Sequence, residues 1–216
     1  MPPWLIALGF LLFSETSAHV HHLEFEKNKG QAPADVRYVL RAPEYQLDFK
    51  RAELVFHFIS TTLRVRFDGP LNKRVPEGHA RIDGLVRYVD TEEAGGDQDI
   101  PKFASIRYDS LYKGIDLVCY IKGTHLECNF VALAGAEPEH IRAFVDATNG
   151  LRIDDSGSLI IQLPDGEIRL HKPSAFQLSH AQRTPIDMAY QINEMNEISF
   201  VIGEYDHSVP LIIDPQ

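Results

Sequence analysis

The sequence predicts an all-β fold, with antiparallel strands in a sandwich-like arrangement of one or more sheet pairs and little helix. Short segments in which apolar and polar residues alternate recur along nearly the whole chain, and this is the period of half-buried strands. Clusters of Gly, Pro, Asn and Asp separate these segments and are typical of turns. A parallel sheet is not expected, because the pattern lacks the crossover helices that it needs.

The first 18 residues have the pattern of a secretory signal peptide. An apolar run occupies residues 4–13, and Thr16 and Ala18 place small residues at the minus-three and minus-one positions of a cut after Ala18. The run is well short of the ~20 residues that span a bilayer, so we expect no membrane span in the mature chain. The sequence thus predicts a signal peptide at 1–18 and a single all-β module at 19–216, secreted or held at the cell surface.

Composition agrees with a globular exported module. Hydrophobic residues make up 44% of the chain and charged residues 24%, which suits a packed core. The chain has 21 basic and 31 acidic residues, for a formal net charge of −10, so nucleic acid is not expected as a partner.

Cleavage after Ala18 would give a mature chain that begins with His19 and carries His21 at its third position. A free α-amine beside these imidazoles could chelate Cu(II) or Ni(II) in a square plane, and an N-terminal histidine is similar to that of copper-dependent polysaccharide oxygenases. The competing interpretation is a polar leader before the first strand. We take this second interpretation as the main one and expect no cofactor.

The first half of the mature chain predicts a meander of four strands, at residues 36–40, 45–49, 54–58 and 63–67. Arg64 and Arg66 interleave with core residues and are expected on the wet face of the sheet. Residues 68–84 lose the alternation and predict a long loop, followed by a strand at 85–89. The acidic loop that comes next, at 91–99, lacks the ligand spacing of a calcium site.

The clearest local signal is a hairpin that contains both cysteines. Apolar residues alternate on both sides of a turn at 122–125, where Gly123 suits the positive φ of a two-residue turn, and this alternation predicts one shared face for both cysteines with Leu117, Ile121, Leu126 and Phe130. Counting outward from this turn places Cys119 directly opposite Cys128 at a non-hydrogen-bonded pair, where the Cα atoms lie about 4.5 Å apart, within reach of a disulfide. Two buried reduced thiols are the alternative if the chain stays in a reducing compartment.

The remainder of the chain continues the alternation without a catalytic motif. Residues 140–146 predict a strand or a brief helical turn, and strands are expected at 151–153, 159–163, 168–170, 188–192 and 198–202. The carboxylates of residues 154–157 have the composition of a turn rather than an acid–base pair. His57 is out of phase with its apolar neighbours and is expected to face solvent. We therefore assign no catalytic residue.

Several motifs in a fixed order resemble a known family. They are FEKNKGQ (25–31), RYDSLYKGIDLVCY (107–120), LECNF (126–130), GAEP (135–138) and YDHSVPLIIDP (205–215). Over residues 25–215 the chain is similar to the domain of unknown function at the N-terminus of bacterial secreted proteins that carry SBBP repeats, the seven-bladed β-propeller family. Lys113 replaces the usual Pro, and Cys119 and Cys128 stand where tyrosines are common in that pattern.

The resemblance implies an extracellular or cell-surface module without established catalytic residues. Three function classes follow from the sequence and the resemblance together. The first is a non-catalytic module that assists surface presentation or binds a surface protein or a glycan. The second is a copper-dependent or carbohydrate-active protein that uses His19. The third is a structural cap for a propeller repeat.

Overall fold

The computed structural model describes residues 23–68, 74–87, 99–146, 149–164, 166–179 and 182–215, and places eighteen strands in these ranges. Every strand pair within them is antiparallel, and helix is confined there to one 3-10 turn, η2 (Pro138–His140). The predicted all-β, antiparallel fold is confirmed. Over the same ranges, no helix has both the length and the hydropathy of a membrane crossing.

The strands form one large sheet and one small sheet. The large sheet holds β1 (Phe25–Lys27), β2 (Tyr38–Arg41), β3 (Gln46–Lys50), β4 (Glu53–His57), β5 (Thr62–Phe67), β6 (Glu77–Arg87), β7 (Asp99–Tyr112), β8 (Ile115–Lys122), β9 (His125–Ala132), β10 (Ala143–Asp146), β14 (Ser174–Ser179), β15 (Gln182–Ile186), β16 (Met188–Ile192), β17 (Glu197–Ile202) and β18 (Leu211–Asp214). The small sheet holds β11 (Gly150–Ile153), β12 (Leu159–Leu163) and β13 (Gly166–Leu170).

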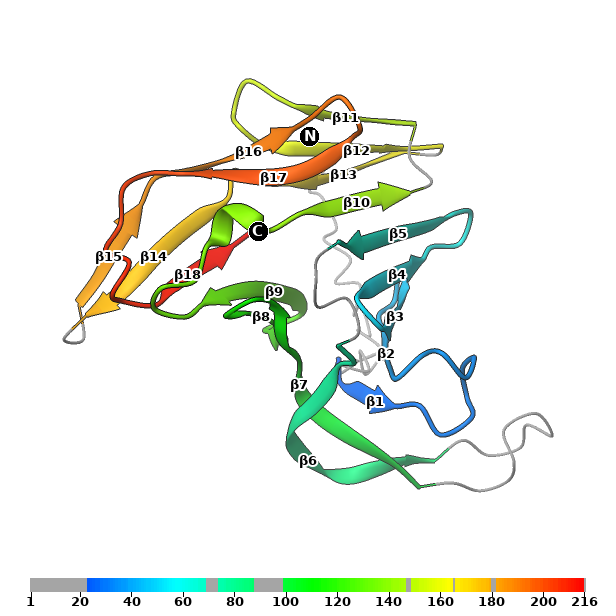
Figure 1. Ribbon diagram of the computed structural model, residues 1–216. Coiled ribbons are helices and arrows are strands. Elements are labelled where there is room, and N and C mark those ends of the chain that lie inside the picture. Colours follow the sequence, from blue (N-terminus) through cyan, green and yellow to red (C-terminus); the bar gives the residue numbers. More distant parts are fainter. Residues whose placement is uncertain are drawn as a thin grey trace, which may run out of the picture.

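The large sheet curls until it is a nearly closed barrel (Figure 1). Its neighbours run β15-β14-β18-β9-β8-β7-β1-β2-β3-β4-β5-β10-β17-β16, with β6 paired to β7 outside this path. Strands β14 and β16, near the two ends of the path, come into contact and nearly close the ring. Apolar side chains on the inner face of this curled sheet form one continuous core.

The predicted four-strand meander is present as β2 to β5. Its register pairs Leu47 with Phe56 and Phe56 with Leu63, so the alternate apolar positions share the inner face. On the outer face Arg66 forms a two-pronged ion pair with Asp146 of β10, at 2.8 and 3.1 Å, as expected for a charged residue on an exposed strand face. The outer face is less exposed to solvent than predicted, because Asp48 occupies an outward position and is nevertheless buried.

The predicted loop at 68–84 is wrong in its second half, because β6 already begins at Glu77. This strand pairs with β7 as a long ribbon and contains a register shift between Ile82 and Leu85, where Gly84 has a φ of +90°. Gly78 is required by packing, since a Cβ there would lie 2.6 Å from the ring of Phe103. Charged residues and glycines obscure the strand period at residues 77–84, which are exposed or half-exposed, so this part of β6 is held by its pairing with β7.

The central hairpin has the predicted register. Strands β8 and β9 pair Lys122 with His125 and Cys119 with Cys128, and Gly123 has a φ of +66° in the turn. The two cysteine Cα atoms lie 4.0 Å apart and the sulfur atoms lie at disulfide distance. Both cysteines belong to the core or pack against it, so the side chains lie on the inner face as predicted.

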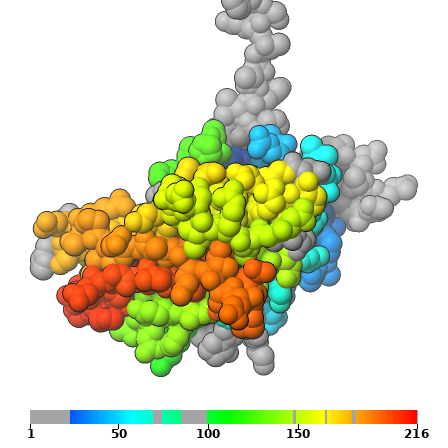
Figure 2. All heavy atoms as spheres, turned by 90° about the horizontal axis from the view of Figure 1, so that it is seen from above, coloured from blue at the N-terminus to red at the C-terminus, as the bar shows by residue number. Residues whose placement is uncertain are grey.

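The small sheet covers the interior of the barrel. Leu159, Ile161 and Leu163 of β12 are buried in the same core as the inner face of the large sheet. Seen from above, the small sheet lies across the molecule, in yellow-green, beside the orange strands β15 to β17 (Figure 2). The space between the small sheet and the curled sheet is where the candidate site lies.

Candidate functional site

The core contains an apolar cavity of about 400 Å³. Its walls come from the meander, the central hairpin, the strands β10, β16 and β17, and both long strands of the small sheet. Protein interiors normally fill such space to the density of an organic crystal, so a cavity of this size is a departure from ordinary core packing. It also falls within the size range of small-molecule sites.

Aromatic rings form the deep wall of the cavity. Phe130 of β9 contacts Phe67 of β5 edge-on at 6.0 Å and Phe200 of β17 at 6.1 Å between ring centroids. Phe200 continues the series to Tyr190 at 5.7 Å. All four side chains are buried, so this wall is rigid and dry.

A second aromatic group lies where the lining becomes exposed. Tyr45 packs against Phe56 and Phe58 with ring centroids 5.7 and 6.0 Å apart, and the two phenylalanine rings stack at 6.3 Å. These three side chains are half-buried, as are Leu126 and Cys128 at the start of β9. We call these five residues, with Glu44 and Glu127, the rim.

The charges of the cavity lining are all at this rim and all acidic. Glu44 and Glu127 are the ionisable carboxylates among the lining residues, and no Lys, Arg or His is among the lining residues that the structure describes. Glu127 lies 3.6 Å from the ammonium of Lys122, whose side chain is largely exposed. Burial and the nearby Glu44 carboxylate raise the pKa of Tyr45, which keeps its hydroxyl neutral.

The other cavity tyrosine has its polar group satisfied within the protein. The hydroxyl of Tyr190 donates a hydrogen bond to the carbonyl of Pro215, and burial raises its pKa. The deep wall therefore presents the ring of Tyr190 and no free donor. Chemically, the cavity can take an apolar body deep inside and can meet a polar group only at the rim.

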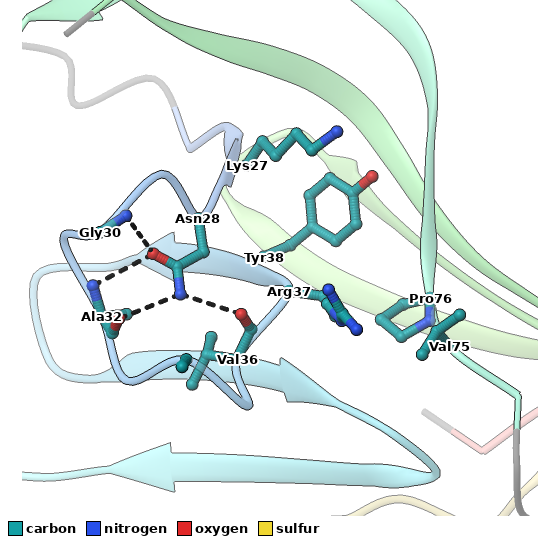
Figure 3. Close-up of a pocket in the computed structure, with 10 residues that line it drawn as sticks. Lys27, Asn28, Gly30, Ala32, Val36, Arg37, Tyr38, Val75 and Pro76 are labelled. Atoms are coloured by element: carbon teal, nitrogen blue, oxygen red, sulfur yellow. Dashed lines mark hydrogen bonds between the residues drawn. The ribbon is translucent and has the colours of Figure 1, made fainter.

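A second hollow, of about 510 Å³, opens beside the loop that follows β1 (Figure 3). Lys27, Arg37, Tyr38 and Pro76 border it, and Asn28 lies at its edge. The amide of Asn28 is engaged within the loop, because its Nδ2 lies 2.9 to 3.0 Å from three backbone carbonyls and its Oδ1 accepts from two backbone N–H groups. This hollow is open, and the amide of Asn28 at its edge has no hydrogen-bonding capacity left for a ligand.

The comparison with known families bears on residues 25–216. A family model described as "Domain of unknown function (DUF7948)" matches that range. The chain belongs to this family. No curated protein and no solved structure matches it. The family assignment supports the resemblance to a domain of unknown function given by the sequence motifs, and carries no activity with it.

Two polar residues outside the cavity lining, Asp116 in one of those motifs and Gln177 outside them, stabilise turns and irregular strands, whereas Glu127 of the LECNF motif lies at the rim. Asp116 is buried and accepts from the backbone N–H of Ser110 at 2.6 Å and from Arg107 at 2.5 Å. It thereby fixes the irregular part of β7, where Ser110 has a φ of +49°. At the other end of the chain, Gln177 bonds the carbonyls of Asp206 and Val209 and the N–H of Asp206, which fixes the segment before β18.

The other residues singled out from the sequence do not converge on the cavity. His57 is half-exposed and its Nε2 lies 2.8 Å from Asp48 on the outer face. Asp154 caps its own turn through Ser156, Ser158 and Arg169, as its turn composition predicted. His19 and His21, together with the predicted signal peptide, lie outside the described residues, as does most of the acidic loop at 91–99.

Of the two cysteines whose pairing was predicted, Cys128 lies in the cavity wall and Cys119 is buried behind it. Sequence reasoning placed them correctly but did not find the cavity. One further cluster, Glu77, His79 and Asp109, brings its ligand atoms within 4.8 Å of one another, but all three residues are exposed. Asp109 also lies 2.6 Å from Nε of Arg107, which engages one of the carboxylates.

Proposed function

We propose that this chain is an exported, non-catalytic β module that binds a small apolar ligand in the cavity between the curled sheet and the small sheet. The observation that carries the proposal is the cavity of about 400 Å³ with its nearly continuous apolar and aromatic lining. The mouths and interiors of β-barrels are frequent places for such sites, since the surrounding strands form a rigid wall.

The chemistry of the lining supports binding over catalysis. Its titratable side chains are the rim carboxylates and the two tyrosines, with no imidazole or ammonium among the lining residues described. Nucleophilic catalysis needs a nucleophile hydrogen-bonded to a base, and the lining offers no such pair in those residues. An apolar ligand, by contrast, needs only an apolar surface to bind against, and each Å² of apolar area removed from water contributes about 25 cal/mol of binding free energy.

The proposal is tested by titration of the purified mature protein with an environment-sensitive apolar dye. We expect saturable binding with one site per chain, abolished by Ala143→Phe, because Ala143 lines the cavity and a benzyl group there would fill it. The matched control is Ala189→Phe, which adds the same group at an exposed position of β16. Equal dye binding by the two variants, with unchanged unfolding midpoints, would show that the cavity is not the site.

Export and the relation to SBBP-repeat proteins complete the proposal. The apolar run at 4–13 and the Thr16 and Ala18 pattern support cleavage after Ala18, so exported protein should begin at His19 in N-terminal sequencing. The motif order supports the family link. The alternative, a copper protein that uses His19 and His21, requires the processed protein to bind Cu(II) more tightly than a His19→Ala control; equal affinity removes it.

A further inference from the structure

The distribution of charge around the cavity points to the class of ligand. We propose that the cavity accepts an alkyl-chain amphiphile whose head group is neutral or cationic, and that it rejects the anionic equivalent. This inference rests on the proposed function, because it assumes that the cavity binds, and it adds the chemistry of the head group. Neither the motifs nor the family assignment bears on this selectivity.

The apolar part of the ligand follows from the depth of the lining. From the rim inward, the walls offer the rings of Phe67, Phe130 and Phe200 and the buried branched side chains of the small sheet, with no unsatisfied polar side chain among them. A polar or branched polar ligand such as a sugar would lose its hydrogen bonds to water there. An alkyl chain loses none, and each methylene that enters should raise the affinity about fourfold.

The head group follows from the rim. We take the rim as the entrance, because its aromatic rings are half-buried, and an amphiphile whose chain enters there leaves its head beside Glu44 and Glu127. Lys122 partly offsets Glu127, at 3.6 Å and largely exposed to solvent. Glu44 is exposed, and no described lining residue supplies a positive charge to offset it. An anionic head would therefore meet a net repulsion that a neutral head avoids.

The aromatic residues of the rim act in the same direction. Tyr45, Phe56 and Phe58 present three rings at mutual centroid distances of 5.7 to 6.3 Å, and ring faces attract cations and repel anions. A quaternary ammonium or a neutral alcohol can rest against these rings while its chain enters the cavity. A carboxylate in the same place would face both the rings and the Glu44 side chain.

The test uses three ligands that share a decyl chain: decanol, decyltrimethylammonium and decanoate. Each is titrated below its aggregation threshold into the mature protein, by calorimetry and by displacement of the apolar dye. We expect decanol and decyltrimethylammonium to bind at least about fivefold more tightly than decanoate at low salt, since like charges near a surface cost on the order of 1 kcal/mol, and higher salt should narrow the difference.

Matched variants separate the rim charge from the overall charge. In the Glu44→Gln/Glu127→Gln double variant, decanoate should bind nearly as well as decanol. The control, Glu194→Gln/Glu204→Gln, removes the same charge at exposed positions outside the lining and should leave the discrimination unchanged. Loss of discrimination in both pairs would attribute it to net charge and overturn the inference.

The outcomes distinguish this inference from the proposed function. Equal affinity for all three ligands, or tighter binding of decanoate, with dye binding still blocked by Ala143→Phe, overturns the head-group selectivity and leaves the binding site intact. Absence of binding by all three ligands and by the dye overturns both. Ligand-independent dimers in sedimentation that disappear with Leu126→Ala at the rim would show that a second copy covers the rim, which also overturns the inference.

Discussion

Two regions of the molecule use side chains in opposite ways. In the turns and irregular strands, the polar side chains of Asn28, Asp116 and Gln177 are engaged in hydrogen bonds, mostly to nearby backbone. In the cavity, the described lining is apolar from the deep wall to the rim, and its two carboxylates are confined to the rim. Each of these three side chains makes at least two hydrogen bonds, while the cavity leaves about 400 Å³ unfilled.

This difference indicates that the polar residues that hold turns and irregular strands are separate from the residues that line the cavity, although Leu126, Glu127, Cys128 and Phe130 of the LECNF motif belong to the lining. Buried polar groups that hold turns and irregular strands tolerate few replacements, because each replacement leaves partners unsatisfied. Apolar residues around a cavity can exchange with one another at little energetic cost, since volume and patterning are all that the fold requires of them. Changes at Asn28, Asp116 or Gln177 should therefore affect stability more than ligand binding, and changes in the cavity lining should affect ligand binding more than stability.

The largest effect on stability is expected for Asp116→Ala. The substitution removes a buried carboxylate that accepts two hydrogen bonds, one from the half-buried Ser110 N–H and one from the partly exposed Arg107 guanidinium, which should cost about 3 kcal/mol of unfolding free energy. Chemical denaturation would measure the loss. The fraction that remains folded should bind the apolar dye with wild-type affinity, because Asp116 is not in the cavity lining.

The control for this change is Glu204→Ala, an exposed position outside strands, where the loss should stay within about 0.5 kcal/mol. A loss for Asp116→Ala that is no larger than for Glu204→Ala would break the distinction between the two regions. So would a change in dye affinity that follows the motif substitution.

Much of the fold could be predicted from the sequence because the apolar alternation is regular where strands border the core. The meander β2 to β5 was predicted in place and the hairpin β8–β9 both in place and in register, since each has short turns and a buried face. The start of β6 and the whole of β7 were not predicted. Their residues alternate poorly, because one half of the ribbon they form has no core behind it.

The cavity could not be predicted because it is a property of volume rather than of pattern. The sequence predicted that Leu126, Cys128 and Phe130 share an inner face, but whether facing strands fill the space between them depends on how the sheet curls. The curl follows from pairings between segments far apart in the chain, such as β9 with β18 and β10 with β5. Nothing in the sequence marks Glu44 and Glu127 as residues of a site, since isolated carboxylates near turns are common.

An intermediate effect is expected at the boundary between the two regions, for Cys119→Ser/Cys128→Ser. The closed loop is short, with a separation of 9 residues, so the lost cross-link should cost about 2 to 3 kcal/mol of unfolding free energy. Peptide mapping without reductant should first show the Cys119–Cys128 linkage in protein from an oxidising compartment. Free thiols in that protein would contradict the assignment of the disulfide.

The serine pair also sharpens the comparison, because Cys128 lines the cavity whereas Cys119 is buried behind it. Dye affinity should fall only modestly, since the hairpin register is also held by its own ladder and turn. An Ala pair at the same positions controls for the polarity of the serine hydroxyl. Wild-type stability in both pairs would show that the linkage adds nothing to the fold.

The smallest effect on stability is expected for Leu126→Ala at the rim. Truncating a leucine to alanine in a filled core lowers the free energy of unfolding by about 2 to 5 kcal/mol, because the cavity left behind collapses only in part. Leu126 is half-buried and already borders empty space, so it has fewer contacts to lose, and we expect about 1 kcal/mol. Leu40, which is fully buried and outside the lining, supplies the contrast, and Leu40→Ala should cost the full range of about 2 to 5 kcal/mol expected for a filled core.

Truncation at the rim also lengthens the cavity, so the preferred alkyl chain should grow by a few methylenes, which a series of alcohols from octanol to tetradecanol would measure by displacement of the dye. Equal stability losses at the two leucines, together with an unchanged chain-length preference, would mean that the cavity is filled by side-chain motion in solution and that the contrast between the two regions does not hold.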